Sequence, residues 1–133
     1  MTTPIPEIVI AAAEAASDKK AADIRVLDVS RHLVITDHFL ICSGNTERQV
    51  KTIAEEVEKR LGEDFGTRPF RREGEREARW VLLDYVDFVI HVFHPDEREY
   101  YDLERLWADV PSEKYDDAQR PESSDEPAAA KAT

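Results

Sequence analysis

The feature that most constrains this chain is a short apolar run followed at once by a helix start. Residues 39–42 are apolar at every position, which is typical of a strand covered on both faces. A Ser-Gly-Asn segment follows, and Thr46 with Gln49 three residues later fits a capping box. After this cap, apolar residues recur at helical spacing up to Gly62: Val50, Ile53, Ala54, Val57 and Leu61. A buried central strand joined directly to an amphipathic helix favours an α/β fold.

The rest of the chain alternates helical and extended patterns. Short runs of β-branched residues predict strands, and a proline beside acidic or hydroxyl residues at a segment start predicts a helix. The predicted elements are a helix over residues 4–19, strands over 24–29, 80–83 and 88–93, a short strand near 68–70, and a helix over 95–110. Their order predicts a single domain, residues 1–111, in which helices pack on a mixed β-sheet.

The C-terminal segment has a different composition from this domain. Residues 112–133 hold six acidic and three basic residues with no apolar periodicity, which predicts a disordered acidic tail. Over the whole chain, 18 Lys and Arg residues stand against 29 Asp and Glu residues, a net charge of −11. This charge opposes direct binding to nucleic acid phosphates and favours a basic partner.

The expected location follows from cysteine usage and hydropathy. Cys42 is the single cysteine, so neither an internal disulfide nor a cysteine-based zinc site is expected, and a reducing compartment suits the chain. No apolar stretch is long enough to span a membrane, and no basic region precedes the first apolar segment. We therefore expect a cytoplasmic protein without a membrane partner.

Patterns that would indicate catalysis are weak. His91 and His94 lie near Asp84 and Asp87, but positions three apart on one strand point to opposite faces, so no metal site is predicted. Ser43 and Gly44 stand at the end of a predicted strand. A Ser-Gly pair in this place is typical of nucleotidyl transferases, but those enzymes also need paired carboxylates to hold magnesium. We favour a protein that is not an enzyme and needs no cofactor, with a magnesium-dependent nucleotidyl transferase as the alternative.

Aromatic residues in the last third of the chain are candidates for partner contacts, because aromatic side chains anchor interfaces. Trp80 and Leu82 alternate onto one face of their predicted strand. On the last predicted helix, Leu103 and Leu106 are expected in the core. The candidate partner-binding residues are Trp80, Leu82, Arg98, Tyr100, Tyr101 and Glu104.

Three segments carry a family resemblance. They read ITDHFLICSGNTERQV at residues 35–50, WVLLDYVDFVIHVF at 80–93 and REYYDLERLW at 98–107. Together they resemble the ribosomal silencing factor family, also called Iojap-like, over about residues 23–107 and in the family's order. One departure is Val86, where the family usually has glycine. Because a β-branched residue disfavours positive φ, we expect a differently shaped turn there.

The resemblance implies a small α/β domain with a nucleotidyltransferase-like outline but without catalytic carboxylates, often dimeric. It implies binding to the large ribosomal subunit through large-subunit ribosomal protein fourteen. Such binding would sterically block joining of the small subunit and lower translation when nutrients are scarce. No reaction or cofactor is implied. A plainer alternative is a general interaction module whose acidic tail recruits a basic partner.

Overall fold

The computed structural model describes residues 5–115, and residues 1–4 and 116–133 lie outside the described part. The elements in chain order are α1 (Glu7–Asp18), β1 (Ala22–Asp28), β2 (His38–Ser43), α2 (Glu47–Phe65), β3 (Arg71–Glu73), β4 (Trp80–Asp84), β5 (Phe88–Phe93), α3 (Pro95–Tyr101), α4 (Leu103–Leu106) and β6 (Ser112–Lys114). This order confirms the predicted mixed α/β domain.

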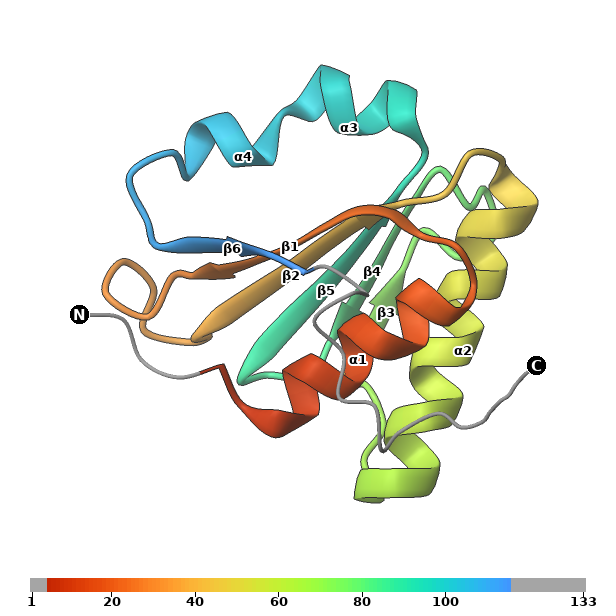
Figure 1. Cartoon of the computed structure of the whole chain (residues 1–133), viewed down its shortest axis with the longest axis horizontal. Helices are drawn as coiled ribbons and strands as arrows, with labels where there is room; N and C mark the ends of the chain where they lie inside the picture. The colour runs from red at the N-terminus through yellow and green to blue at the C-terminus, as the bar shows by residue number, and fades with distance from the viewer. Residues whose placement is uncertain (1–4, 116–133) are drawn as a thin grey trace.

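The described strands form one six-stranded sheet in the order β3-β4-β5-β2-β1-β6. β2 and β5 pair in parallel, whereas the other neighbouring strands are antiparallel. All residues of β2 are buried, as predicted for a central strand. α1 and α2 cover one face of the sheet, and α3 and α4 lie over the opposite side (Figure 1).

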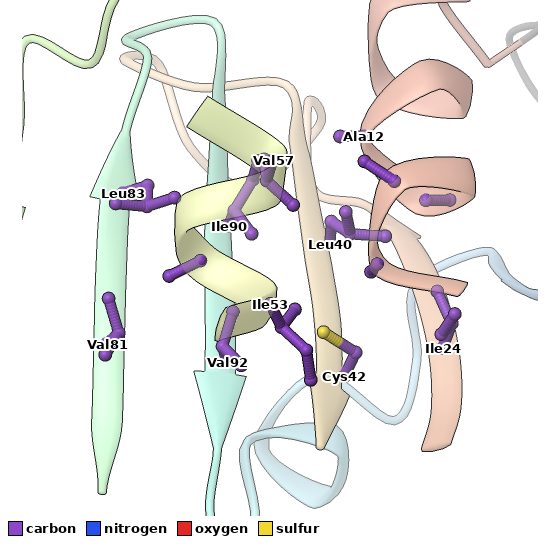
Figure 2. Packing of buried hydrophobic residues seen from close by; sticks show 14 of the residues in the cluster. Ala12, Ile24, Leu40, Cys42, Ile53, Val57, Val81, Leu83, Ile90 and Val92 are labelled. Carbon is purple, nitrogen blue, oxygen red and sulfur yellow. The ribbon is translucent and has the colours of Figure 1, made fainter. Parts of the chain in front are cut away.

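The face under α1 and α2 holds the larger hydrophobic core. Leu40 of β2 and Ile90 of β5 pack with Ile53 and Val57 of α2 (Figure 2). All four side chains are fully buried. Full burial of one such side chain contributes about 1.5–3 kcal/mol, so this layer supplies much of the apolar burial that stabilises the fold.

The N-terminus of α2 has the predicted cap. Thr46 Oγ1 accepts a hydrogen bond from the backbone N–H of Gln49 at 3.1 Å, and Gln49 Oε1 accepts one from the backbone N–H of Asn45 at 2.7 Å. Gln49 Nε2 also donates to the carbonyl oxygens of residues 19 and 20. The cap therefore ties the end of α1 to the start of α2.

Several predicted boundaries shift. α2 continues through Gly62 to Phe65, because Gly66, with φ of 64°, supplies the left-handed cap that glycine adopts without strain. α1 begins at Glu7, and its predicted start at residue 4 lies outside the described residues. The short strand predicted near 68–70 is β3, which begins just after that segment.

The predicted continuous helix over residues 95–110 is wrong. Asp102 adopts φ of 49° and ψ of 56°, a left-handed conformation that aspartate tolerates better than most residues, and it separates α3 from α4. Tyr100, Leu103 and Trp107, which a single helix would align on one stripe, are thereby divided between different segments.

The first residues of the predicted disordered tail, 112–133, are ordered. Ser112–Lys114 form β6, which pairs antiparallel with β1. The prediction of disorder is wrong here because β6 is an exposed edge strand held by backbone hydrogen bonds, which need no apolar side-chain pattern. Residues 116–133 of the predicted tail lie outside the described residues.

Candidate docking surface

The second face of the sheet, opposite α1 and α2, is only partly covered. Its smaller core contains Phe39 and Ile41 of β2 and Phe93 of β5, with Trp107 packed against them. The rings of Trp107 and Phe39 meet edge-on with centroids 5.6 Å apart. The segment that follows α3 therefore covers part of this face and leaves the rest to solvent.

The break before α4 decides which leucine enters this core. Leu103 is partly buried and packs against the edge of the smaller core, so its predicted core position is only partly confirmed. Leu106 is 74% exposed, so its predicted core position is wrong. The left-handed backbone at Asp102 redirects the chain, and the side of α4 that carries Leu106 no longer continues the apolar side of α3.

Trp80 lies on this partly covered face. Trp80 and Leu82 are half-buried on this face of β4, whereas the residues between and after them are buried under α2, so the predicted alternation is confirmed. The Trp80 ring stacks on Phe93 with centroids 4.8 Å apart and contacts Tyr101 with centroids 4.7 Å apart. Its indole Nε1–H donates to His91 Nδ1 at 3.1 Å.

Two neighbouring tyrosines extend the aromatic region into solvent. Tyr100 is 81% exposed and Tyr101 is 50% exposed, and their rings meet edge-on with centroids 5.0 Å apart. Exposed aromatic residues grouped on one face are typical of protein interaction sites. We call Trp80, Leu82, Tyr100 and Tyr101 the docking surface.

Arg98 and Glu104, the other two candidate contacts, bind each other. Arg98 is 9% exposed, and its Nη2 lies 2.6 Å from Glu104 Oε2 and 3.4 Å from Asp23 Oδ2. Arg98 Nη1 also donates to Ser43 Oγ at 2.8 Å. These contacts hold α3 and α4 against the ends of β1 and β2, which assigns a positioning role to both residues.

An apolar hollow of about 360 Å³ lies beside the docking surface and shares Leu82 with it. Sequence reasoning missed this hollow, because its walls come from the β1–β2 loop, the segment around β3, and the β4–β5 hairpin. Phe70, at its rim, is 78% exposed. The lining residues are Leu33, Ile35, Thr36, Phe39, Phe70, Arg71, Leu82, Asp84, Val86, Val89 and His91.

The β4–β5 turn forms one edge of the hollow and is strained. Val86 has φ of 74°, and the N–H of Asp87 donates to the carbonyl of Tyr85 at 2.9 Å, which is the pattern of a classic γ-turn. The expectation that Val86 avoids positive φ is wrong. Asp84 Oδ1 accepts the N–H of Val86 at 2.8 Å, and Tyr85 N–H donates to the Phe88 carbonyl, so surrounding hydrogen bonds impose the conformation.

The residues considered for catalysis have structural contacts. Asp84 accepts the turn hydrogen bond and lies 3.5 Å from Arg71 Nη2. Ser43 Oγ accepts from Arg98, and His94 caps α3 by accepting the N–H of Asp96 at Nδ1. Over residues 5–115 no group of three or more His, Cys, Asp or Glu side chains is arranged to hold a metal ion.

Cys42 is buried, and this burial raises the pKa of its thiol to about 12, so the thiol stays protonated at neutral pH.

In the part of the chain that the structure describes, no helix is both long and apolar enough to cross a membrane.

The fold and the exposed aromatic surface indicate the class of protein, and the family follows from sequence comparison. An α/β domain that leaves part of one sheet face and a group of aromatic side chains open to solvent has the features typical of protein-interaction domains. The chain belongs to the family described as Ribosomal silencing factor during starvation (RsfS), whose model matches residues 2–133.

Curated relatives agree with this family. The chain is 50% identical over 100 residues to a protein named ribosomal silencing factor RsfS from Bacillus subtilis, covering 75% of this chain and 84% of the relative. It is 47% identical over 106 residues to the protein of the same name from Halalkalibacterium halodurans, covering 80% and 90%. It is 34% identical over 115 residues to the chloroplastic protein Iojap of Zea mays, covering 84% of this chain and 48% of that one.

Solved structures show the same fold. A crystal structure of a protein from Chromobacterium violaceum matches with a TM-score of 0.76 and 36% identity, covering 90% of this chain and 98% of the other. One from Bacillus halodurans matches with a TM-score of 0.70 and 44% identity, covering 82% and 98%. The family resemblance inferred from the three sequence segments is thereby confirmed.

Proposed function

We propose that this chain binds the large ribosomal subunit through its docking surface, with large-subunit ribosomal protein fourteen as the direct contact. The bound chain then prevents the small subunit from joining and lowers translation when nutrients are limiting. Family membership supports the ribosomal role, because its curated relatives are named as ribosomal silencing factors. This action needs no reaction and no cofactor.

The exposed aromatic group is the observation that carries this proposal. Trp80 is held between Phe93 and Tyr101, so its ring is already ordered before a partner arrives. Preordered aromatic residues lose little conformational entropy on binding and are frequent hot spots. Trp80, Leu82, Tyr100 and Tyr101 would contact the partner, while Arg98 and Glu104 would act indirectly by fixing α3 and α4.

The charge of the chain suits a basic ribosomal protein. A net charge of −11 attracts a positively charged protein surface and repels exposed ribosomal RNA. One bound copy of the chain is enough to exclude the small subunit sterically. We propose separately that the chain forms the homodimer that the family resemblance implies. Sedimentation equilibrium of the purified protein would test for this dimer.

The test is sedimentation of the purified protein with separated ribosomal subunits, followed by addition of the small subunit. We expect the protein to sediment with large subunits alone and to prevent formation of complete ribosomes. Trp80→Ala should weaken binding about 30-fold, equivalent to about 2 kcal/mol. Ile10→Ala removes an exposed apolar side chain from α1 and should bind normally. Unbound wild-type protein at the top of the gradient would contradict the proposal.

A further inference from the structure

α3, the short helix that carries both exposed tyrosines, is anchored by a charged side chain. Of the described residues in the two short helices, Arg98 of α3 is the only buried one, and α4 has none. Leu103 and Trp107, which follow α3, are partly buried against the smaller core. A surface helix normally attaches through a stripe of apolar side chains. Here a guanidinium takes that place, so the position of α3 depends on the groups that pair with Arg98.

The guanidinium of Arg98 has partners on three other elements. Its Nη1 donates to Ser43 Oγ of β2 at 2.8 Å, and its Nη2 lies 2.6 Å from Glu104 Oε2 of α4. The same Nη2 lies 3.4 Å from Asp23 Oδ2 of β1. A buried charge keeps a large desolvation cost unless opposite charges and hydrogen bonds compensate it. These partners therefore hold the guanidinium, and with it α3, at one place on the sheet.

Asp23 reaches Arg98 because β1 is irregular at this point. The pairing of β1 with β2 shifts register between Ala22 and Arg25, and Asp23 has φ of 50°. An irregularity of this kind changes the direction of a side chain at the end of a strand. Asp23 Oδ1 accepts a hydrogen bond from Arg25 Nε at 3.0 Å, while Asp23 Oδ2 is the oxygen that faces Arg98. One carboxylate thus joins two arginines.

Arg25 closes a ring of four alternating charges. Its Nε lies 3.8 Å from Glu104 Oε2, the oxygen that also pairs with Arg98. We call Asp23, Arg25, Arg98 and Glu104 the charge ring. Each member lies between two opposite charges, so the ring links β1 to α3 and α4 without an uncompensated charge.

The charge ring lies one helical turn from the docking surface. Tyr101 follows Arg98 by three residues in α3, and its ring contacts Trp80 with centroids 4.7 Å apart. We propose that Asp23 and Arg25 are positioning residues for the docking surface. Through the charge ring they hold Arg98 and thereby keep Tyr101 against Trp80, in the geometry that the partner binds. This inference rests on the proposed function.

A matched pair of aspartate variants separates positioning from overall charge. Asp23 and Asp102 both have positive φ, which asparagine also tolerates, so each change to asparagine removes one charge without new backbone strain. Within residues 5–115, Asp102 takes part in no ion pair, although it directly follows Tyr101. Affinity for purified large subunits, measured by titration, should fall about 3- to 10-fold for Asp23→Asn and stay within about twofold for Asp102→Asn.

A pair of arginine variants tests the sign of the effect. Arg25→Gln and Arg48→Gln each make the chain more negative, which strengthens its general attraction to a basic partner. Arg48 is exposed on α2 and pairs with no acidic side chain of the described residues. We expect Arg25→Gln to weaken large-subunit binding about 2- to 3-fold, because it opens the charge ring, and Arg48→Gln to bind as well as wild type or better.

The position of Tyr101 can be measured in the free protein. Nuclear Overhauser contacts between the Trp80 indole and the Tyr101 ring should weaken in Asp23→Asn and in Arg25→Gln. They should be unchanged in Asp102→Asn and Arg48→Gln. Urea denaturation checks that each variant folds, and if Asp23→Asn does not unfold cooperatively, Arg25→Gln decides.

The outcomes separate this inference from the proposed function. Failure of the wild-type protein to sediment with large subunits overturns the proposed function and the inference with it. Normal affinity of Asp23→Asn and Arg25→Gln overturns the inference and leaves the proposed function standing. Weakened binding with unchanged contacts between Trp80 and Tyr101 would assign Asp23 and Arg25 to direct partner contact, which also overturns it. An equal loss in Asp102→Asn would assign the effect to overall charge, with the same consequence.

Discussion

The two faces of the sheet are built from alternate residues of the same strands, yet one is closed and the other is partly open. Under α1 and α2, Leu40, Ile53 and Ile90 are fully buried. On the opposite face, Trp80 is half-buried beside exposed tyrosines. The difference lies in the covering elements: α2 is a long continuous helix, whereas α3 and α4 are short and separated at Asp102. Continuous cover buries the apolar side chains of one face, and interrupted cover leaves aromatic side chains of the other face exposed.

The largest expected effect is a loss of folding stability when a side chain of the closed face is shortened. Ile53→Ala should lower the free energy of unfolding by about 2–5 kcal/mol, because it leaves a cavity among fully buried side chains. Ile35→Ala, at an exposed position on the other side, should change it by less than about 0.5 kcal/mol. Urea denaturation of both variants measures the contrast, and equal losses would contradict the assignment of the core.

The second prediction concerns binding by the open face. Tyr101→Ala should weaken large-subunit binding by about 2 kcal/mol, as expected for a hot-spot aromatic residue. Its loss should cost less folding stability than Ile53→Ala, because half of the side chain is exposed. Affinity measured by sedimentation, with urea denaturation as the folding control, separates the two effects. A stable Tyr101→Ala protein that binds normally would remove this residue from the docking surface.

The third prediction concerns pH and His91, a buried histidine on the open face. Burial lowers its pKa from 6.5 to about 4. Between these values the unfolded chain binds a proton that the folded protein excludes, so folding stability falls as the pH decreases through this range. Wild-type protein should lose about 2 kcal/mol more between pH 7 and pH 5 than His91→Gln, which does not titrate. Identical pH dependence in urea denaturation would contradict this.

The smallest expected effect concerns Val86, the strained residue of the β4–β5 turn on the open face. Val86→Gly should raise the free energy of unfolding by about 1 kcal/mol, because relief of the strained positive φ outweighs the entropy that glycine loses on folding. Val34→Gly, at an exposed position without positive φ, is the control and should be slightly destabilising. Differential scanning calorimetry of the two variants measures the opposite signs.

The parts of the fold that sequence reasoning predicted correctly are those encoded by neighbouring residues. The central strand and the start of α2 follow from an apolar run and from a cap that Thr46 and Gln49 complete within one helical turn. The alternation of Trp80 and Leu82 follows from the period of a strand. Each pattern depends on residues that are close in sequence, so it can be read without knowing how the rest of the chain folds.

The site was predicted less completely, because its contacts join distant or unexpectedly placed segments. Arg98 and Glu104 are six residues apart, a spacing that places residues on different sides of a continuous helix. They pair after the chain turns at Asp102. The hollow joins Thr36, Phe70 and His91, and no short motif relates them. β6 was missed for a different reason, since backbone hydrogen bonds hold it without an apolar pattern.

The sequence by itself determined the layered α/β domain, the buried central strand, the face that Trp80 occupies and the family resemblance. The tertiary structure decided which aromatic residues remain exposed, that Arg98 lies inside, and that an apolar hollow opens beside Leu82. The physical reason is that periodicity records which side of an element is apolar, whereas exposure depends on how far other elements extend over it. Here that extent depends on the left-handed residue Asp102 and on ion pairs that form only in the folded chain.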